Sequence, residues 1–451
     1  MAPTVRSFSA ALEPLNLVET YPDSYPGLLE SGAVATATGS GGRFDILPMV
    51  NGESLRLESG GHLCGPHAGA DGFLAALDRW WNDLRLPQTA STLPFTGGWL
   101  LYLSYELASE AEPRLRLPPS GDRVLALALR APAAWIRDRV SGRAWLIAEA
   151  GGEYLLDEFE SRVRLGASVA AANIPEIMIT EDEPATFLDA VRRSLEYIAA
   201  GDVYQTNLSR GWQGRARSPV EPAAIYKRLR TSNPSPFAAL LRDGDFVLLS
   251  SSPERLVSIR GNTVSTRPIA GTRPRGATAA ADTALVQSLL DNEKERAEHV
   301  MLIDLERNDL GRVCAGGSVR VDEYMSVETY AHVHHIVSNV SGRLRPDVSP
   351  VAAIRALFPG GTITGCPKIR CMEIIAELEG TGRGAYTGSL GYLNRDGGCD
   401  LNILIRTITA QAGVFKFRAG AGIVADSVAV QELAETRAKA EGLIRALVTH
   451  P

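Results

Sequence analysis

The stretch FAALLRDGDFVLLSSSPERLVSIRGNTVSTRPIAG, residues 237–271, decides the fold. FAALLRD and DFVLLSSS are short apolar runs joined by a Gly turn, and ERLVSIR and NTVSTRPIAG continue the pattern. Such runs, separated by tight turns, are typical of β-hairpins. Because strands that follow one another through short turns pair antiparallel, the sequence predicts an α+β fold with antiparallel sheets and helices packed outside them. It does not predict a βαβ array.

Helical and strand patterns extend outward from this stretch in both directions. PATFLDAVRRSLEYIAAGD (184–202) predicts an amphipathic helix, VYQTNLSRGW (203–212) a strand, and NILIRTIT (402–409) part of a later hairpin. Residues 1–165 contain strand-like runs broken by Gly and Pro, whereas residues 166–184 lack a clear period and predict a linker. We therefore expect an N-terminal region, 1–165, and a second region, 183–447.

Composition excludes several classes of partner. The 451 residues are 45% hydrophobic and 22% charged, with a formal net charge of −6, which leaves no basic footprint for nucleic acid or an anionic membrane. No apolar run is long enough for a membrane span, and the N-terminus lacks the apolar core of a signal peptide. The odd number of cysteines, without a C-x-x-C pair, favours reduced thiols and a cytoplasmic location (Cys64, Cys314, Cys366, Cys371 and Cys399).

Two Glu-x-x-Glu pairs, Glu295/Glu298 and Glu432/Glu435, each predict two carboxylates on one face of a helix. Pairs of this kind are common on solvated helix faces. Brought together, however, the four carboxylates would form an oxygen site suited to Mg²⁺. The pairs by themselves leave both interpretations open.

Two glycine-rich segments imitate nucleotide-binding motifs. GAGIVA (420–425) resembles a dinucleotide fingerprint, but the preceding strands form hairpins rather than a βαβ unit. Its glycines instead indicate a backbone that a ligand approaches closely. GGTITGCPK (360–368) lacks the spacing of a phosphate loop and predicts a tight turn that leads into a helix near Pro367.

Histidine and arginine positions supply further candidates. His332 and His334 share one face of a predicted strand and His335 points to the other, without a Cys or carboxylate nearby in the sequence to complete a zinc site. Arg406 interrupts an apolar strand. It would be paired in a structural salt bridge or would bind a substrate carboxylate through its guanidinium.

Taken together, these segments resemble the chorismate-utilising enzymes, which include anthranilate synthase component I, aminodeoxychorismate synthase component I, and isochorismate and salicylate synthases. The resemblance is strong over about 183–447 and looser before it. It rests on GDVYQTNLSR, TSNPSPF, SSPERL, RPIAGTRPRG, AEHVMLIDLERNDLGR, HHIVSNVSG, FPGGTITGCPK, AYTGSLGY, LIRT, AGAGIVADS and ELAETRAKA. It implies two antiparallel sheets between outer helices, an α/β/β/α sandwich with the active site in a cleft.

The resemblance also implies roles for particular residues. The four glutamates match the positions around Mg²⁺, the expected cofactor. Glu254 matches the general acid that helps the ring hydroxyl leave, and His335 matches an active-site histidine. Positions that line the chorismate site are matched by Gly271, Thr272, Thr364, Tyr386, Arg406, Gly420, Ala421, Gly422 and Lys439.

Two positions distinguish members of the family. Gln205 stands where the water-using members carry a lysine base, which implies that this chain uses ammonia. Ala270 stands where aminodeoxychorismate synthases often carry a nucleophilic lysine and anthranilate synthases carry alanine. The covalent lysine route is therefore not expected here.

Regional resemblances favour aminodeoxychorismate synthase component I, namely GRFDILPMV, the Gly-Gly of FPGGTITG, and GSLGYL. LLES (28–31) matches the tryptophan-pocket region of both groups and does not discriminate. The resemblance implies Mg²⁺-dependent amination of chorismate at C4, a transferase reaction that gives 4-amino-4-deoxychorismate for p-aminobenzoate and folate. Ammonia would come from a glutamine amidotransferase subunit. Anthranilate synthesis for tryptophan is the alternative.

A protein of another class is also conceivable, a catalytically silent regulatory subunit that binds an aromatic amino acid. The intact set of Glu, Arg and Gly positions argues against this alternative, because a silent chain would not need four converging carboxylates.

Overall fold

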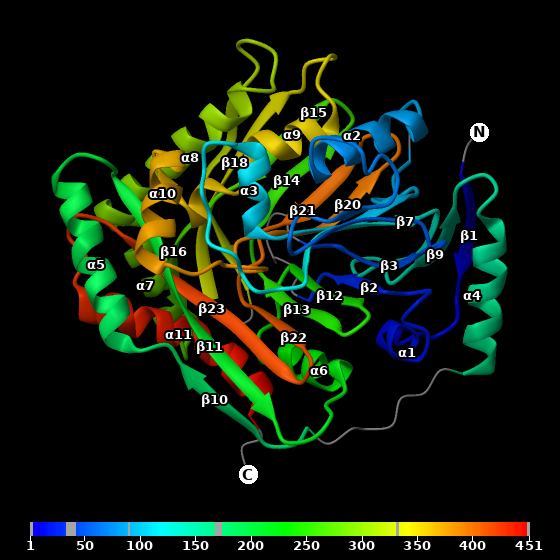
Figure 1. The fold of residues 1–451 in the computed structure, drawn as a ribbon, viewed down its shortest axis with the longest axis horizontal. Helices are drawn as coiled ribbons and strands as arrows, with labels where there is room; N and C mark the ends of the chain where they lie inside the picture. The colour runs from blue at the N-terminus through cyan, green and yellow to red at the C-terminus, as the bar shows by residue number, and fades with distance from the viewer. Residues whose placement is uncertain (1–2, 33–41, 89–90, 167–173, 331–332, 449–451) are drawn as a thin grey trace.

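The computed structural model describes all residues except 1–2, 33–41, 89–90, 167–173, 331–332 and 449–451. Two large antiparallel sheets form its centre (Figure 1). In the described residues the first sheet runs in the order β1 (Thr4–Phe8), β9 (Ala144–Ala148), β8 (Ala133–Asp138), β3 (Phe44–Met49), β2 (Gly27–Glu30), β12 (Phe237–Asp243), β13 (Phe246–Ser252), β22 (Thr407–Gln411), β23 (Val414–Ile423), β11 (Gln205–Ala216) and β10 (Ile177–Glu181), with β19 (Gly365–Cys366) paired to β11.

The second sheet carries the other half of the predicted hairpins. Its order is β16 (Ile269–Pro274), β18 (Val333–Arg343), β15 (Thr263–Arg267), β14 (Arg255–Arg260), β21 (Cys399–Asn402), β20 (Ser389–Asn394), β6 (Gly98–Leu103), β7 (Val124–Ala131), β4 (Ser54–Glu58) and β5 (Leu63–Cys64), with β17 (Arg320–Thr329) paired to β18. The stretch 237–271 supplies β12–β13 to the first sheet and β14–β16 to the second. It therefore links the two sheets.

Both hairpins in that stretch close through a glycine. Asp243 pairs with Phe246 around Gly244, and Arg260 pairs with Thr263 around Gly261. Each glycine has a positive φ near +60°, a backbone conformation that side chains with a Cβ rarely adopt. The predicted antiparallel α+β fold is confirmed.

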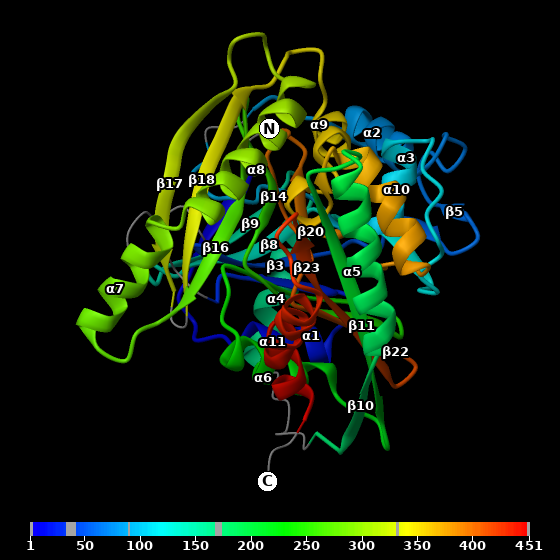
Figure 2. The ribbon, with the colours of Figure 1, turned by 90° about the vertical axis from the view of Figure 1, so that its left-hand side faces the viewer.

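Helices cover the outer face of each sheet (Figures 1 and 2). Their bounds are α1 (Pro14–Thr20), α2 (Phe73–Leu84), α3 (Ala108–Ala111), α4 (Glu153–Leu165), α5 (Pro184–Ala199), α6 (Pro222–Ser232), α7 (Ala279–Leu290), α8 (Glu293–Gly311), α9 (Pro350–Leu357), α10 (Lys368–Glu379) and α11 (Ala429–Leu447), with short 3-10 turns η1 (Tyr105–Leu107) and η2 (Gly361–Ile363). None of the described helices combines the length and apolarity needed to cross a membrane.

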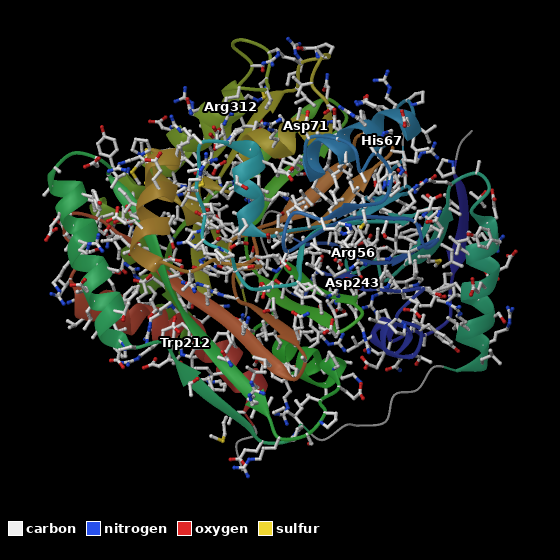
Figure 3. The ribbon with its side chains drawn as sticks, viewed as in Figure 1. Arg56, His67, Asp71, Trp212, Asp243 and Arg312 are labelled. Atoms are coloured by element: carbon white, nitrogen blue, oxygen red, sulfur yellow. The ribbon has the colours of Figure 1, made fainter. Side chains whose placement is uncertain are left out.

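Four hydrophobic cores of described residues hold the layers together, the smallest of them between α5, α10 and the β11–β23 strand pair. One core packs the second sheet under α2, α8 and α9, another packs the first sheet against α1, α4, α6 and α11, and a third fills the space between the sheets. Strand β6 shows the principle, since Trp99 and Leu101 enter the outer core while Leu100 and Tyr102 enter the core between the sheets. An ion pair between Arg56 of β4 and Asp243 of β12 also joins the two sheets (Figure 3).

The two regions distinguished in the sequence share both sheets. Within the described part of the chain, residues before 165 supply five strands at one end of the first sheet and four at one end of the second. Consequently, strands that are far apart in the chain pair with each other within one sheet. For example, Leu240 of β12 pairs with Leu28 of β2.

Two local predictions were wrong. The expected linker contains β10, which pairs with β11 through residues 177–181; its period was hidden because only five residues alternate. Residues 167–173 of that linker lie outside the described part. Arg406 is not within a strand, because β21 ends at Asn402 and β22 begins at Thr407, and its φ is +51°.

Candidate active site

The two predicted glutamate helices meet. Glu295 and Glu298 lie near the start of α8, and Glu432 and Glu435 lie near the start of α11. Burial raises the pKa of Glu298, and the carboxylates of Glu295, Glu432 and Glu435 raise it further. The fold has therefore gathered four like charges from segments more than 130 residues apart, which a solvated helix face would not require.

Two of the four carboxylates are held by neighbouring cations. Arg273 Nη1 lies 2.7 Å from Glu295 Oε1, and Lys439 Nζ lies 2.6 Å from Glu435 Oε1. Glu295 Oε2 is buried without a hydrogen-bond partner among the described residues. Within the same residues, no three His, Cys, Asp or Glu side chains are arranged so that they could hold a metal ion as they stand. The donor chemistry fits Mg²⁺, and its binding stays a prediction.

Strands β16 and β18 carry the next part of the site. Gly271 has φ +63°, and a Cβ there would lie 2.7 Å from Glu295 Oε2, so only glycine fits against that carboxylate. Thr272 Oγ1 lies 2.9 Å from His335 Nδ1. Burial, with a smaller contribution from Arg406, lowers the pKa of His335 to about 3. His335 is thus a neutral hydrogen-bonding group near pH 7. Ala270 precedes Gly271 on β16 and pairs with Ile336.

Glu254 lies between β13 and β14, with a side chain that is 5% exposed. Burial raises its pKa to about 7, and the nearby Glu306 carboxylate contributes to the rise. Its Oε1 is buried without a hydrogen-bond partner among the described residues. A carboxyl with this pKa holds its proton for a substantial part of the time at neutral pH, which suits a general acid.

Three residues behind Glu254 were missed in the sequence. Glu306 and Asp309 lie on the buried face of α8, and Lys368 of α10 forms an ion pair with Asp309. Burial raises the pKa of Glu306 to about 7, with a further contribution from Asp309. Glu306 and Asp309 follow the same helical spacing as the apolar residues Leu302, Leu305 and Leu310. Their position on this apolar face was the sign in the sequence that they would be buried.

Arg406 has no carboxylate within ion-pair distance among the described residues, and its Nη1 donates only a long hydrogen bond, 3.4 Å, to Asn233 Oδ1. Burial lowers its pKa, and Glu254 opposes that effect. The salt-bridge interpretation of Arg406 is therefore not borne out in the described residues. A guanidinium without an ion pair is left within electrostatic range of Glu254 and His335.

The glycine-rich end of β23 faces β11 and Tyr386. A Cβ at Gly420 would lie 2.6 Å from Tyr386 Oη, and one at Gly422 would lie 2.4 Å from Gln205 Nε2. Lys439 Nζ donates to the Gly420 carbonyl over 3.1 Å. Ala421 points the other way, into the core of α5 and α10, so only its backbone could meet a ligand. Burial raises the pKa of Tyr386 to about 12.

Thr364 is fully buried behind β11. Its hydroxyl donates to the Gly360 carbonyl over 2.9 Å, and its own carbonyl accepts from the Asn207 N–H over 3.0 Å. The predicted turn before α10 is present, with Pro367 as its N-cap residue. Lys368 is engaged by Asp309, which agrees with the rejection of a phosphate loop.

The histidine cluster does not form a zinc site in the described residues. His334 Nε2 lies 2.8 Å from Asp282 Oδ1, and its Nδ1 lies 2.9 Å from Thr329 Oγ1. A carboxylate is therefore close in space, contrary to the sequence-based expectation, because α7 folds back onto β18. His334 joins α7 to the sheet. His332 lies outside the described residues.

A cavity of about 220 Å³ lies between the sheets and away from these groups. Leu29, Glu30 and Ser31 of LLES line it, together with Phe237 and Tyr392. Phe44 of GRFDILPMV and Leu390 and Gly391 of GSLGYL also line it. Two of the three segments that favoured aminodeoxychorismate synthase thus face this cavity rather than Glu254. A cleft at the Glu254 group stays a prediction.

Comparison with known proteins identifies the family. Residues 66–445 match the model of the chorismate binding enzymes, so the chain belongs to that family. It is 44% identical over 366 residues to an anthranilate synthase component I-like protein of a Synechocystis species, covering 79% of this chain and 73% of the relative. It is 43% identical over 397 residues to aminodeoxychorismate synthase component 1 of Bacillus subtilis, covering 83% and 82%.

A solved structure supports the same fold assignment. Anthranilate synthase component I from Streptococcus pneumoniae superposes with a TM-score of 0.79 at 32% identity, covering 89% of this chain and 92% of that one. The chain is accordingly a chorismate-utilising enzyme with the two-sheet fold of its family, and relatives with two different products match it at similar identity.

Proposed function

We propose that this chain is the chorismate-aminating component of an aminodeoxychorismate synthase, which replaces the C4 hydroxyl of chorismate with an amino group. One observation carries the proposal: buried Glu254, with a pKa near 7, acts electrostatically on Arg406, which has no ion-pair partner among the described residues. An acid ready to protonate a leaving hydroxyl and a cation ready for a carboxylate are what this reaction requires.

Binding would use groups that the fold leaves without strong partners. Arg406 would hold one chorismate carboxylate by its guanidinium. The backbone at Gly420 and Gly422, bare of side chains, would let the substrate approach β23 closely, with the Tyr386 hydroxyl beside it. His335, neutral and hydrogen-bonded to Thr272, would position the ring without adding charge.

Glu295, Glu298, Glu432 and Glu435 would hold Mg²⁺. When bound, the ion would neutralise the gathered carboxylates and the second carboxylate of chorismate. The unpartnered Glu295 Oε2 and the raised pKa of Glu298 support this assignment, since both are relieved by a divalent cation.

The chemical step would need only proton transfer and a nucleophile. Glu254 would give its proton to the leaving hydroxyl, which departs as water. Gln205 cannot act as a base toward water, which supports ammonia as the nucleophile. We propose that a glutamine amidotransferase subunit supplies the ammonia, as the component naming of the relatives suggests.

Anthranilate synthesis is the second candidate, and Ala270 favours it. Alanine on β16 excludes a covalent lysine adduct at that position. The segments around the inter-sheet cavity lie away from Glu254. They therefore support amination at C4 only because they resemble the corresponding segments of aminodeoxychorismate synthases. Direct amination at C4, without a covalent intermediate, is the reaction we propose.

The deciding experiment is an incubation of the purified chain with chorismate, Mg²⁺ and ammonium chloride, followed by chromatographic separation of products. 4-Amino-4-deoxychorismate, converted to p-aminobenzoate only after a lyase is added, would support the proposal. Anthranilate as the main product would overturn it in favour of the second candidate.

A further inference from the structure

Two residues at the candidate site have a strained backbone. Thr387 has a φ of +63° and Arg406 a φ of +51°, two of the five positive values that residues other than glycine show in the described part of the chain. A β-branched residue such as threonine rarely adopts this conformation, because its Cβ crowds the backbone. Such strain persists only where the surrounding structure fixes it, and it is concentrated at functional sites. Arg406 is itself a candidate site residue, and Thr387 directly follows another, Tyr386.

Hydrogen bonds join the two strained segments. The Thr387 N–H donates to the Leu404 carbonyl over 2.8 Å, and the Leu404 N–H donates to the Gly388 carbonyl over 2.9 Å. Leu404 is fully buried in the core between the sheets. Two residues further along, the Arg406 carbonyl accepts from the Ser251 N–H over 3.0 Å. A change in the backbone at Thr387 would therefore be transmitted to the segment that carries Arg406.

The side chain of Thr387 makes contacts that a glycine could not make, although a glycine would adopt a positive φ without strain. Thr387 is 1% exposed, and its hydroxyl donates to the Tyr386 carbonyl. The same hydroxyl accepts a long hydrogen bond, 3.4 Å, from Arg383 Nη1. These bonds fix the peptide that joins Tyr386 to Thr387, and the Tyr386 hydroxyl in turn faces Gly420. The strained backbone is thus accompanied by a hydroxyl that holds a substrate-facing residue.

We propose that Thr387 is a positioning residue for chorismate binding, because its left-handed backbone and its hydroxyl together hold Tyr386 and, through Leu404, the segment that carries Arg406. The inference rests on chorismate binding by Tyr386 and Arg406 in the proposed function, and it is independent of which ring carbon is aminated. Thr387 acts through these two neighbours rather than on the reacting atoms. Its loss therefore weakens substrate binding more than it slows the chemical step.

The test compares chorismate binding by the wild-type chain and by Thr387→Gly. Calorimetric titration with chorismate, in the presence of MgCl₂ and without ammonium, measures Kd, and turnover with ammonium chloride measures KM and kcat. Thr387→Gly should raise the Kd and the KM for chorismate by about 3- to 10-fold, the value of one neutral hydrogen bond, and should change kcat by less than about threefold. The KM for ammonium should stay within about twofold of the wild-type value. Thermal melting checks that the variant is folded.

Two further variants control for backbone strain and for the hydroxyl. Ala412 has a φ of +49° in the exposed turn between β22 and β23, so Ala412→Gly relieves the same kind of strain away from the site. Thr387→Ser keeps the hydroxyl. Both variants should keep the Kd for chorismate within about twofold of the wild-type value. If Thr387→Gly does not fold, Thr387→Ala, which removes the hydroxyl and keeps the Cβ, takes its place in the comparison.

Three results would overturn the inference. The first is a folded Thr387→Gly, or Thr387→Ala in its place, that binds chorismate like the wild-type chain or changes only kcat. The second is a Thr387→Ser variant that loses as much affinity as Thr387→Gly. The third is an equal loss in Ala412→Gly, since that variant leaves the site untouched.

Failure of the proposed function has a separate signature. If the wild-type chain forms anthranilate, C4 amination is wrong, while the comparison of Kd values still decides the role of Thr387. If the wild-type chain binds no chorismate in the titration, both the role of Thr387 and the proposed function are overturned.

Discussion

Two sets of buried polar groups, one around Ser209 and one that includes Gln205, Asn207 and Glu254, differ in how completely they are paired. Around Ser209, Glu379 accepts hydrogen bonds from Ser209, Arg383 and Arg418, and its side chain is 2% exposed. By contrast, Gln205 Oε1 and Asn207 Oδ1 on β11, and Glu254 Oε1 between β13 and β14, have no hydrogen-bond partners among the described residues. The fold thus carries a closed network and a set of open acceptors.

The difference distinguishes buried polar groups that stabilise the fold from buried polar groups that stay available to a substrate. A buried carboxylate with two arginines stabilises the fold only while all partners are present. Although burial alone would raise the pKa of Glu379, Arg383 and Arg418 lower it. Glu254 lacks such cations in direct contact, so its pKa rises instead. Opposite pKa shifts in these two buried carboxyls indicate which one is reserved for a substrate.

The largest expected effect is on the open side. Glu254→Gln should reduce kcat by about 10²- to 10⁴-fold, the usual contribution of a general acid. Stability should change by less than about 1 kcal/mol, because no ion pair is broken. Turnover with ammonium and denaturant unfolding measure the two quantities. A Glu254→Gln variant with full activity would contradict its assignment as the acid.

Glu379→Ala should have the opposite effects, a large loss of stability and a small change in kcat. Removal of the carboxylate leaves Arg383 buried without its partner, at a cost of about 3–5 kcal/mol in the free energy of unfolding. Because the pKa of Glu379 is lowered, its contribution is present above pH about 4.5 and is lost as the pH falls through the folded-state pKa. Unfolding curves at pH 7 and pH 4 measure this. Arg445→Ala, which breaks an exposed pair with Glu441, is the control and should cost at most about 1 kcal/mol.

Glu298→Gln should weaken Mg²⁺ binding by roughly 10- to 100-fold, comparable to the loss of a supporting group at a metal site. Calorimetric titration of the chain with MgCl₂ measures binding without turnover. Glu441→Gln, an exposed glutamate on the same α11 that carries Glu432, supplies the comparison and should bind normally. Equal binding by both variants would remove Glu298 from the metal site.

The smallest effect concerns pH. If Glu254 acts while protonated, activity should decline as pH rises above about 7, the pKa that burial and Glu306 produce. Glu306→Gln removes the nearby charge, so this decline should begin at a pH lower by about one unit or less. Rate–pH profiles test the shift. Asp304→Asn, on the exposed face of α8, should leave the profile unchanged.

Prediction from the sequence succeeded where the signal is local. The hairpins of 237–271 and the helices with Glu295 and Glu432 follow from alternation and helical period over short windows. The candidate residues came from motif resemblance, and the structure brings Glu254, His335, Arg406 and the glutamates into one region. β10 was missed because it alternates over only five residues.

The missed residues share another cause. Glu306, Asp309 and Lys368 resemble ordinary charged helix residues until the fold brings the start of α10 to α8, where Lys368 pairs with Asp309. Asn207 resembles any strand residue until the register places it beside Gly422. None of these positions has a local pattern that reveals its partner.

The sequence by itself therefore determined the element types, the antiparallel hairpins and the family of substrate, because these depend on local periodicity and on short motifs. Only the tertiary structure decided which buried polar groups are paired and which are open. Pairing depends on side chains that lie up to hundreds of residues apart in sequence, and burial changes the pKa and the hydrogen-bonding of each group only after those segments have met.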